Sequence, residues 1–168
     1  MIYGLVPIGG KGTRLGLTFS KEMLPQKGSL HFNPISNHLV GKMKEAGAYQ
    51  IVFIHGFEFK KDVLDFFNSS YHQHYLQKAE GFSNVVREFL LNTSLQNNDQ
   101  ILFGMPDTVF RGNPFHEMLT HDGLACALFT TNDKSKVDRL LMNEKKFAIK
   151  CAKSSNLEDR FWGLLKFD

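Results

Sequence analysis

Residues 6–26 have the sequence VPIGGKGTRLGLTFSKEMLPQ. It leaves an apolar run through three glycines within four positions: Gly9, Gly10 and Gly12. Glycine loses more backbone entropy on ordering than any other residue, so dense glycines are typical of a sharp turn or of backbone that lies close to a ligand. Two cations, Arg14 and Lys21, follow. Backbone N–H groups flanked by cations suit a polyphosphate, so we expect a buried strand that leads into a phosphate-binding loop.

The composition is ordinary for a globular protein and favours one domain over residues 1–168, with 42% hydrophobic and 22% charged residues. The net charge is only +3, and lysine and arginine are spread along the chain, which argues against a nucleic-acid-binding face. Two cysteines are too few for a disulfide framework. No signal-peptide pattern and no apolar run near the roughly 18 residues of a membrane span is present, so we expect a cytoplasmic protein without a membrane partner.

Apolar strands alternate with amphipathic helices along most of the chain. We expect strands at residues 2–8, 50–54, 71–77, 100–103 and 123–131, and helices at residues 32–48, 60–68, 84–91 and 114–121. Two half-apolar runs within residues 136–153 indicate a hairpin, and residues 161–167 a last strand. The alternation predicts an α/β fold: a Rossmann-like three-layer α/β/α sandwich around a mostly parallel mixed sheet.

The helix expected at residues 32–48 has signals at both ends. Asn33 is a candidate cap, Pro34 is expected at the first helical position, and Gly47 is expected to stop the helix.

The glycine loop differs from two common phosphate-binding motifs. The dinucleotide fingerprint G-x-G-x-x-G needs a third glycine or alanine, and Leu15 breaks the series that Gly10 and Gly12 begin. A P-loop needs lysine and then serine or threonine after its last glycine, which the order GGKGT does not provide. A plain surface turn is the alternative, but it leaves the cations that follow unexplained.

GGKGTRL followed by SKEMLP resembles the signature of the sugar-nucleotide pyrophosphorylases, G-G-x-G-T-R-L and then [SP]-K-x-[LM]-L-P. The residues that fit are Gly9, Gly10, Gly12, Thr13, Arg14, Leu15, Ser20, Lys21, Met23, Leu24 and Pro25. The resemblance runs in order through FGMPDTVF, residues 103–110, to roughly the end of the chain. It implies a sugar-1-phosphate nucleotidyltransferase, similar to glucose-1-phosphate thymidylyltransferases, with the nucleotide-diphospho-sugar transferase fold.

The resemblance also implies roles for the motif residues. The backbone of Gly9, Gly10, Gly12 and Thr13 would cradle the triphosphate of the nucleoside triphosphate. Arg14 would bind the departing pyrophosphate, and Lys21 would hold the α-phosphate and the attacking phosphate of a sugar 1-phosphate. Such residue types fit the chemistry, because nucleotidyl transfer gathers several anionic oxygens in one transition state, and catalysis consists mostly of positioning and charge neutralisation.

Four further residues take roles by resemblance. Asp107 follows the strand expected at residues 100–103, where the family holds Mg²⁺ against the nucleotide. Gln77 and Gly81 would contact the nucleobase, although the family more often has small residues where this chain has Phe82 and Ser83. Lys153 falls where the family has a lysine on the sugar phosphate, without the usual flanking glutamate and proline.

The family continues beyond the length of this chain and supplies a second metal-binding aspartate there, so we expect slow or absent turnover by these residues alone. The alternative function is a non-catalytic module that binds a nucleotide or nucleotide sugar. The residues do not name the base or the sugar, and they leave homo-oligomerisation open. His72 and His74 are two apart on an expected strand, so their side chains should lie on the same face. Because no third ligand is clear, we interpret them as a surface pair and not as a metal site.

Overall fold

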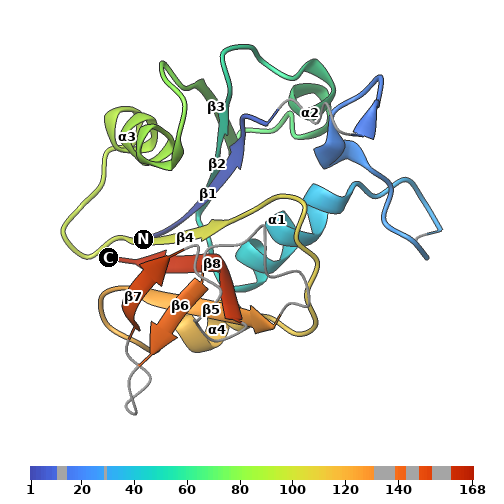
Figure 1. The fold of residues 1–168 in the computed structure, drawn as a ribbon. Helices are drawn as coiled ribbons and strands as arrows, with labels where there is room; N and C mark the ends of the chain where they lie inside the picture. Colours follow the sequence, from blue (N-terminus) through green and yellow to red (C-terminus); the bar gives the residue numbers. More distant parts are fainter. Residues whose placement is uncertain (11–14, 29, 131–138, 143–147, 153–159) are drawn as a thin grey trace.

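A computed structural model describes residues 1–10, 15–28, 30–130, 139–142, 148–152 and 160–168. Within these residues the strands are β1 (Ile2–Ile8), β2 (Gln50–His55), β3 (His72–Leu76), β4 (Gln100–Gly104), β5 (Ala125–Thr130), β6 (Arg139–Met142), β7 (Ala148–Ala152) and β8 (Arg160–Phe167). They form one sheet in the order β3-β2-β1-β4-β8-β6-β7, with β5 paired to β8 (Figure 1). The strand order begins and ends away from β1, which therefore lies inside the sheet.

The sheet divides into a parallel and an antiparallel part. β1 runs parallel to β2 and β4, and β2 runs parallel to β3. β8 is antiparallel to β4, β5 and β6, and β6 is antiparallel to β7, which confirms the hairpin and the last strand expected from the sequence. The carboxyl ends of the four parallel strands consequently share one edge of the sheet.

Helices cover both faces of the sheet. They are α1 (Ile35–Glu45), α2 (Lys61–Phe66), α3 (Phe82–Asn92) and α4 (Pro114–Met118), preceded by the 3₁₀ turn η2 (Lys21–Met23). α1, α2 and α4 contribute to one apolar core, and α3 contributes Val85 and Phe89 to the other. This confirms the expected three-layer α/β/α sandwich (Figure 1). Among the described helices, none is long and apolar enough to cross a membrane.

The start of α1 differs from the sequence expectation. Pro34 is the residue before the helix, and Asn33 does not cap it, because its side chain bonds to Gln26 and Asn37 instead. The N–H group of Ile35 donates to the carbonyl of Leu24 at 2.7 Å, so a tertiary contact satisfies the group that a cap would have satisfied.

The end of α1 agrees with the sequence expectation. Gly47 follows the helix with a φ of +92°, a conformation that glycine adopts without strain, and its N–H group donates to the carbonyl of Lys44.

Two glycines let α1 lie close to the sheet. A Cβ atom on Gly4 of β1 would lie 2.8 Å from the Sδ of Met43 and 2.4 Å from the Cδ1 of Ile51. A Cβ atom on Gly104 of β4 would lie 2.5 Å from the Cδ1 of Leu39. Met43 and Leu39 belong to α1 and are fully buried, so the helix packs directly over the backbone of both strands.

We expect Gly4→Ala to lower the free energy of unfolding by about 1–3 kcal/mol, because the added methyl group has no space in a close-packed core. Gly41→Ala in α1 is the matched control. A Cβ atom there would meet nothing within 4 Å, so this change should stabilise the helix by about 0.5–1 kcal/mol. Urea unfolding measures both. A Gly4→Ala protein as stable as the wild type would contradict the close packing.

Candidate functional site

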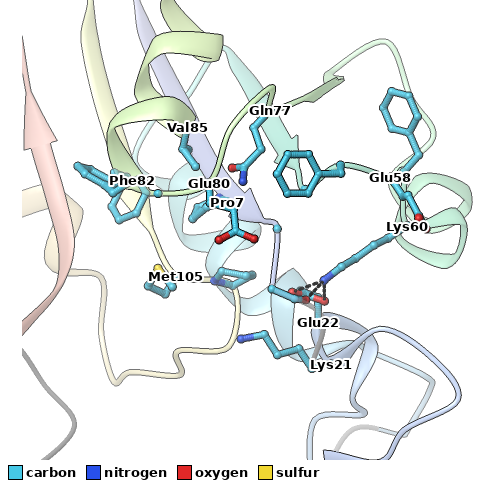
Figure 2. Close-up of a pocket in the computed structure, with 18 residues that line it drawn as sticks. Pro7, Lys21, Glu22, Glu58, Lys60, Gln77, Glu80, Phe82, Val85 and Met105 are labelled. Atoms are coloured by element: carbon cyan, nitrogen blue, oxygen red, sulfur yellow. Dashed lines mark hydrogen bonds and ion pairs between the residues drawn. The ribbon is translucent and has the colours of Figure 1, made fainter. Parts of the chain in front are cut away.

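A pocket of about 630 Å³ opens at the carboxyl ends of β1, β2 and β4 (Figure 2). Gly9 and Gly10 line it from the loop after β1, residues 56–60 from the connection after β2, and residues 105–106 from the loop after β4. Ligands of open α/β sheets bind at this edge, since the loops that leave parallel strands meet there. The glycine-rich loop of the sequence is therefore part of a pocket.

The connection from β3 to α3 forms another side of the pocket. Gln77 is buried, its backbone N–H donates to the carbonyl of His55 at 3.1 Å, and its side chain points into the pocket (Figure 2). Gly81 precedes α3 with a φ of +103°, which favours glycine at this position. Phe82 and Val85 add apolar surface beside the Gln77 amide. An amide beside apolar side chains is suited to a flat ring that carries hydrogen-bonding groups.

The loops after β1 and β2 touch through their backbones. A Cβ atom on Gly56 would lie 2.9 Å from the carbonyl oxygen of Gly9, so only glycine fits at position 56 without a shift of the neighbouring loop. A Cβ atom on Gly9 would lie 3.6 Å from the Oε1 of Gln77. Sequence reasoning missed Gly56. Its position directly after a buried strand could have indicated a loop that lies close to the site.

Lys21 and Asp107 lie together at the edge of the pocket. The Nζ of Lys21 is 2.7 Å from the Oδ2 of Asp107, although the residues are 86 positions apart in the chain. Both side chains remain accessible, with exposed fractions of 23% and 40%. The pair joins the 3₁₀ turn η2 to the loop after β4, so two residues singled out by the sequence face each other.

Lys60 and Glu22 form a second ion pair that sequence reasoning missed. The Nζ of Lys60 lies 2.9 and 2.8 Å from the two carboxylate oxygens of Glu22 and 2.7 Å from the carbonyl oxygen of Gly10 (Figure 2). The Glu22 side chain is only 1% exposed. Glu22 occupies the variable position of the K-x-M-L-P pattern, and Lys60 is one of many lysines, so neither carries a local signal of its partner.

Ser20 and Asp62 fasten η2 to the start of α2. The hydroxyl and the backbone N–H of Ser20 both donate to the Asp62 carboxylate, each at 2.7 Å. Burial by itself raises the pKa of Asp62, but these hydrogen bonds and the one from the Val63 N–H outweigh it and bring the pKa below its ordinary value. The carboxylate is therefore ionised at neutral pH and holds Ser20, the residue before Lys21, in place.

Some predicted site residues lie outside the described residues: Gly12, Thr13, Arg14 and Lys153. Among the described residues, no group of three or more histidine, cysteine, aspartate or glutamate side chains could hold a metal ion by itself. Asp107 is the carboxylate that the sequence proposes for a metal, and it stands at the pocket edge beside Lys21. Among the described residues it is not part of a metal-ligating group, so a cation there would also draw on oxygens of a bound ligand or water.

Comparison of the chain with protein-family models and with curated proteins finds no match. Comparison with solved structures finds close likenesses. One is a protein from Bacillus anthracis assigned as a glucose-1-phosphate thymidylyltransferase, in complex with sucrose; the likeness has a TM-score of 0.80 and 21% identity, and covers 100% of this chain and 72% of the other. Another is a UDP-glucose pyrophosphorylase complexed with UDP-glucose, with a TM-score of 0.78, 18% identity, and 99% and 76% of the two chains covered.

The chain has the Rossmann-like fold of these two proteins. It is the fold that the sequence resemblance implied, and both comparisons extend over nearly the whole chain. At these identities the likeness concerns the fold, and the roles of individual residues depend on the geometry of the pocket itself.

Two hydrogen-bonded histidines, His55 of β2 and His74 of β3, anchor the segment of the pocket that carries Lys60. The backbone N–H of Lys60 donates to the Nδ1 of His55 at 3.0 Å, so a neutral His55 carries its proton on Nε2, which lies 2.9 Å from the Nδ1 of His74. The Nε2 of His74 then donates to the carbonyl of Phe67 at 3.2 Å. The chain of hydrogen bonds fixes both tautomers and anchors the backbone of Lys60 to β2 and β3.

The histidines of β3 share one face, as expected, because both rings pack against Phe53. The interpretation as a surface pair was wrong, since His72 and His74 are half-buried among aromatic rings and hydrogen bonds. The sequence pattern missed this because Phe67 and Phe53, which cover the two rings, come from a helix end and a neighbouring strand.

Burial keeps these histidines neutral. Burial lowers the pKa of His55 from 6.5 to about 3, helped by repulsion from the protonated form of His74 and from the charge of Lys60. Burial, with the charge of Lys44, lowers the pKa of His72 to about 4, and burial also lowers the pKa of His74. Since the unfolded chain binds these protons below about pH 6.5 and the folded chain does not, stability must fall as the pH decreases through this window.

We expect the free energy of unfolding to fall as the pH is lowered from 6.5 towards 4, with a shallower slope for His55→Gln. Each proton bound only by the unfolded state adds at most about 1.4 kcal/mol per pH unit. His31→Gln, at an exposed histidine before α1, is the control and should keep the wild-type slope. Urea titrations at several pH values measure it. Equal slopes for the wild type and His55→Gln would exclude His55 as a source of the pH dependence.

Proposed function

We propose that this chain is a sugar-1-phosphate nucleotidyltransferase. It transfers a nucleoside monophosphate from a nucleoside triphosphate to a sugar 1-phosphate, with a nucleotide sugar and pyrophosphate as products. The pairing of Lys21 with Asp107 at the pocket edge carries the proposal, because it joins the two charged groups of the family pattern across 86 positions of chain. The fold shared with a structure assigned as a glucose-1-phosphate thymidylyltransferase and with a UDP-glucose pyrophosphorylase supports it.

The phosphate chemistry is assigned to the glycine loop and two cations. Backbone groups of Gly9 and Gly10, continued by Gly12 and Thr13, would hold the triphosphate. An oxygen of the sugar phosphate attacks the α-phosphorus, and the bond from that phosphorus to the bridging oxygen of pyrophosphate breaks. Lys21 stabilises the charge on the α-phosphate and the attacking phosphate, and Arg14 holds the departing pyrophosphate.

Asp107 could bind a divalent cation together with oxygen atoms of the bound triphosphate. Its carboxylate is an oxygen ligand of the kind that Mg²⁺ prefers, and it is accessible at the pocket edge. Bound Mg²⁺ would supply positive charge to the phosphate oxygens. Asp107 would hold the cation, and Lys21, its neighbour at the pocket edge, would bind the α-phosphate.

The remaining assignments concern the base and the sugar. The Gln77 amide offers both a donor and an acceptor inside the pocket, and Gly81 allows close approach at the start of α3. Both would contact the base. Lys153 would contact the phosphate of the sugar. A thermal-shift panel of the common triphosphates and nucleotide sugars, with and without Mg²⁺, identifies the preferred base and sugar.

We expect Mg²⁺ and the triphosphate to bind cooperatively, and Asp107→Asn to remove this cooperativity, because the amide lacks the charge that attracts the cation. Calorimetry measures triphosphate binding with and without Mg²⁺ in the wild type and the variant. Asp65→Asn, at an exposed carboxylate of α2 that pairs with Lys61, is the control and should keep the cooperativity. Cooperativity that survives Asp107→Asn would remove Asp107 from the site.

We expect Lys21→Gln to reduce the rate of pyrophosphate exchange about 100-fold while it weakens triphosphate binding much less, because the charge matters most in the transition state. Lys61→Gln, at a lysine that is 84% exposed, should leave the rate unchanged. Radiolabelled pyrophosphate exchange and calorimetry provide the two readouts. Triphosphate binding without any exchange in the wild type would favour the non-catalytic module instead.

A further inference from the structure

We propose that Lys60 is a positioning residue of the nucleotide site. Its ammonium group holds the Gly10 carbonyl and the Glu22 carboxylate together, and it thereby sets the direction in which Lys21 enters the pocket. The inference rests on the function proposed above for Lys21. Lys60 is not assigned a contact with the reacting phosphates, because its donors are directed at protein acceptors.

The ammonium group of Lys60 uses its three donors on three protein oxygens. They are the two carboxylate oxygens of Glu22, at 2.9 and 2.8 Å, and the carbonyl oxygen of Gly10, at 2.7 Å. These acceptors belong to the glycine loop after β1 and to the 3₁₀ turn η2, whereas Lys60 precedes α2. One side chain therefore ties three segments together at the floor of the pocket (Figure 2).

Lys21 lies where the two tied segments meet. It is the residue before Glu22 in the single turn of η2, so a rotation of that turn moves both side chains. A Cβ atom on Gly10 would lie 3.7 Å from the Cε of Lys21, so the Gly10 backbone abuts the Lys21 side chain. Lys60 thus fixes both the base of the Lys21 side chain and the surface against which it extends.

Lys60 is itself held from the opposite side. Its backbone N–H donates to His55, and His55 is hydrogen-bonded to His74. The anchor belongs to β2 and β3, which are paired strands of the sheet. The ammonium group is therefore held relative to the sheet, and a small displacement of η2 has to break its bonds to Glu22.

A buried ion pair of this kind is expected to fix the positions of the groups around it more than to raise the free energy of unfolding. Removing one partner leaves a buried charge unpaired and destabilises a protein, whereas replacing both partners by apolar residues is often neutral. An apolar pair at positions 22 and 60 would fill the space but could not bind the Gly10 carbonyl. The double replacement Lys60→Met with Glu22→Leu therefore separates the two contributions.

The test compares the double variant with the wild type in two ways. We expect a free energy of unfolding close to that of the wild type, but a kcat for nucleotidyl transfer reduced at least tenfold with a smaller change in triphosphate Kd, since small displacements of a catalytic group are costly. The matched control replaces an exposed pair, Lys61→Met with Asp65→Leu, and should keep the wild-type kcat. Wild-type kcat in a stable Lys60–Glu22 double variant would overturn the proposal.

A second readout needs no activity. NMR of the lysine ammonium groups in the ligand-free protein reports the environment of Lys21, which is paired with Asp107. We expect the Lys21 signal to move in the Lys60–Glu22 double variant and to stay in the Lys61–Asp65 control. An unchanged Lys21 signal would overturn the proposal. A wild-type protein that shows this response but binds no triphosphate would contradict the proposed function and leave the positioning by Lys60 supported.

The single variant Lys60→Arg covers the case in which the double variant fails to fold. It keeps the charge beside Glu22, but the planar guanidinium cannot aim its N–H groups as the ammonium does at Glu22 and Gly10. We expect a folded protein with a displaced Lys21 signal and a kcat reduced about fivefold or more. A Lys60→Arg protein with the wild-type kcat and Lys21 signal would overturn the proposal.

Discussion

The close contact between α1 and the backbone of β1 and β4 constrains the middle of the sheet, where these two strands are neighbours. Gly4 and Gly104 have no side chains, so Met43 and Leu39 of the helix rest directly on the two strands. β1 and β4 pair in parallel beneath the helix, and the loops that leave their carboxyl ends line the same pocket. The loop after β1, which holds Gly9, and the loop after β4, which holds Asp107, therefore leave the same edge of the sheet.

The two ion pairs of the pocket differ in how easily they can exchange partners. Lys21 and Asp107 are accessible, so water and a charged ligand can compete with the bond between them. Lys60 and Glu22 are enclosed, and separating them would leave a charge in a poorly solvated place. Lys21 of the accessible pair and Glu22 of the enclosed pair are neighbours in η2, so the turn that presents the accessible lysine is held by a buried ion pair.

Much of the fold could be predicted because its strands and helices carry local patterns. Short apolar runs that end in glycine or a turn marked the strands, the rule that ligands gather at strand ends placed Asp107 in the site, and the motif resemblance placed Lys21 there. The predicted cap of α1 was wrong because the Asn33 side chain bonds to Gln26 and Asn37, and the N–H of Ile35 donates to the carbonyl of Leu24, a group well before the helix in the sequence. Local patterns report burial and periodicity, but they do not report which distant group supplies a hydrogen bond.

The same limit explains the parts of the site that were missed. Glu22 and Lys60 are 38 positions apart, and a buried carboxylate between Lys21 and Met23 looks like any exposed glutamate in a loop. His72 and His74 were assigned to the surface because the rings that cover them come from other elements. Pairing of this kind depends on the tertiary fold, which brings β2, β3 and η2 together, so a local sequence pattern does not report it.

The enclosure of Lys60 has a chemical consequence for the neighbouring lysines. Acylating reagents and acetyl-transferring enzymes need an amine nitrogen that can lose its proton and reach the attacking partner. Lys60 is only 16% exposed and all its donors are engaged, whereas Lys61, the next residue, is 84% exposed. Acylation of the folded protein would therefore mark Lys61 and spare Lys60, so two adjacent and chemically identical side chains differ in reactivity through the fold alone.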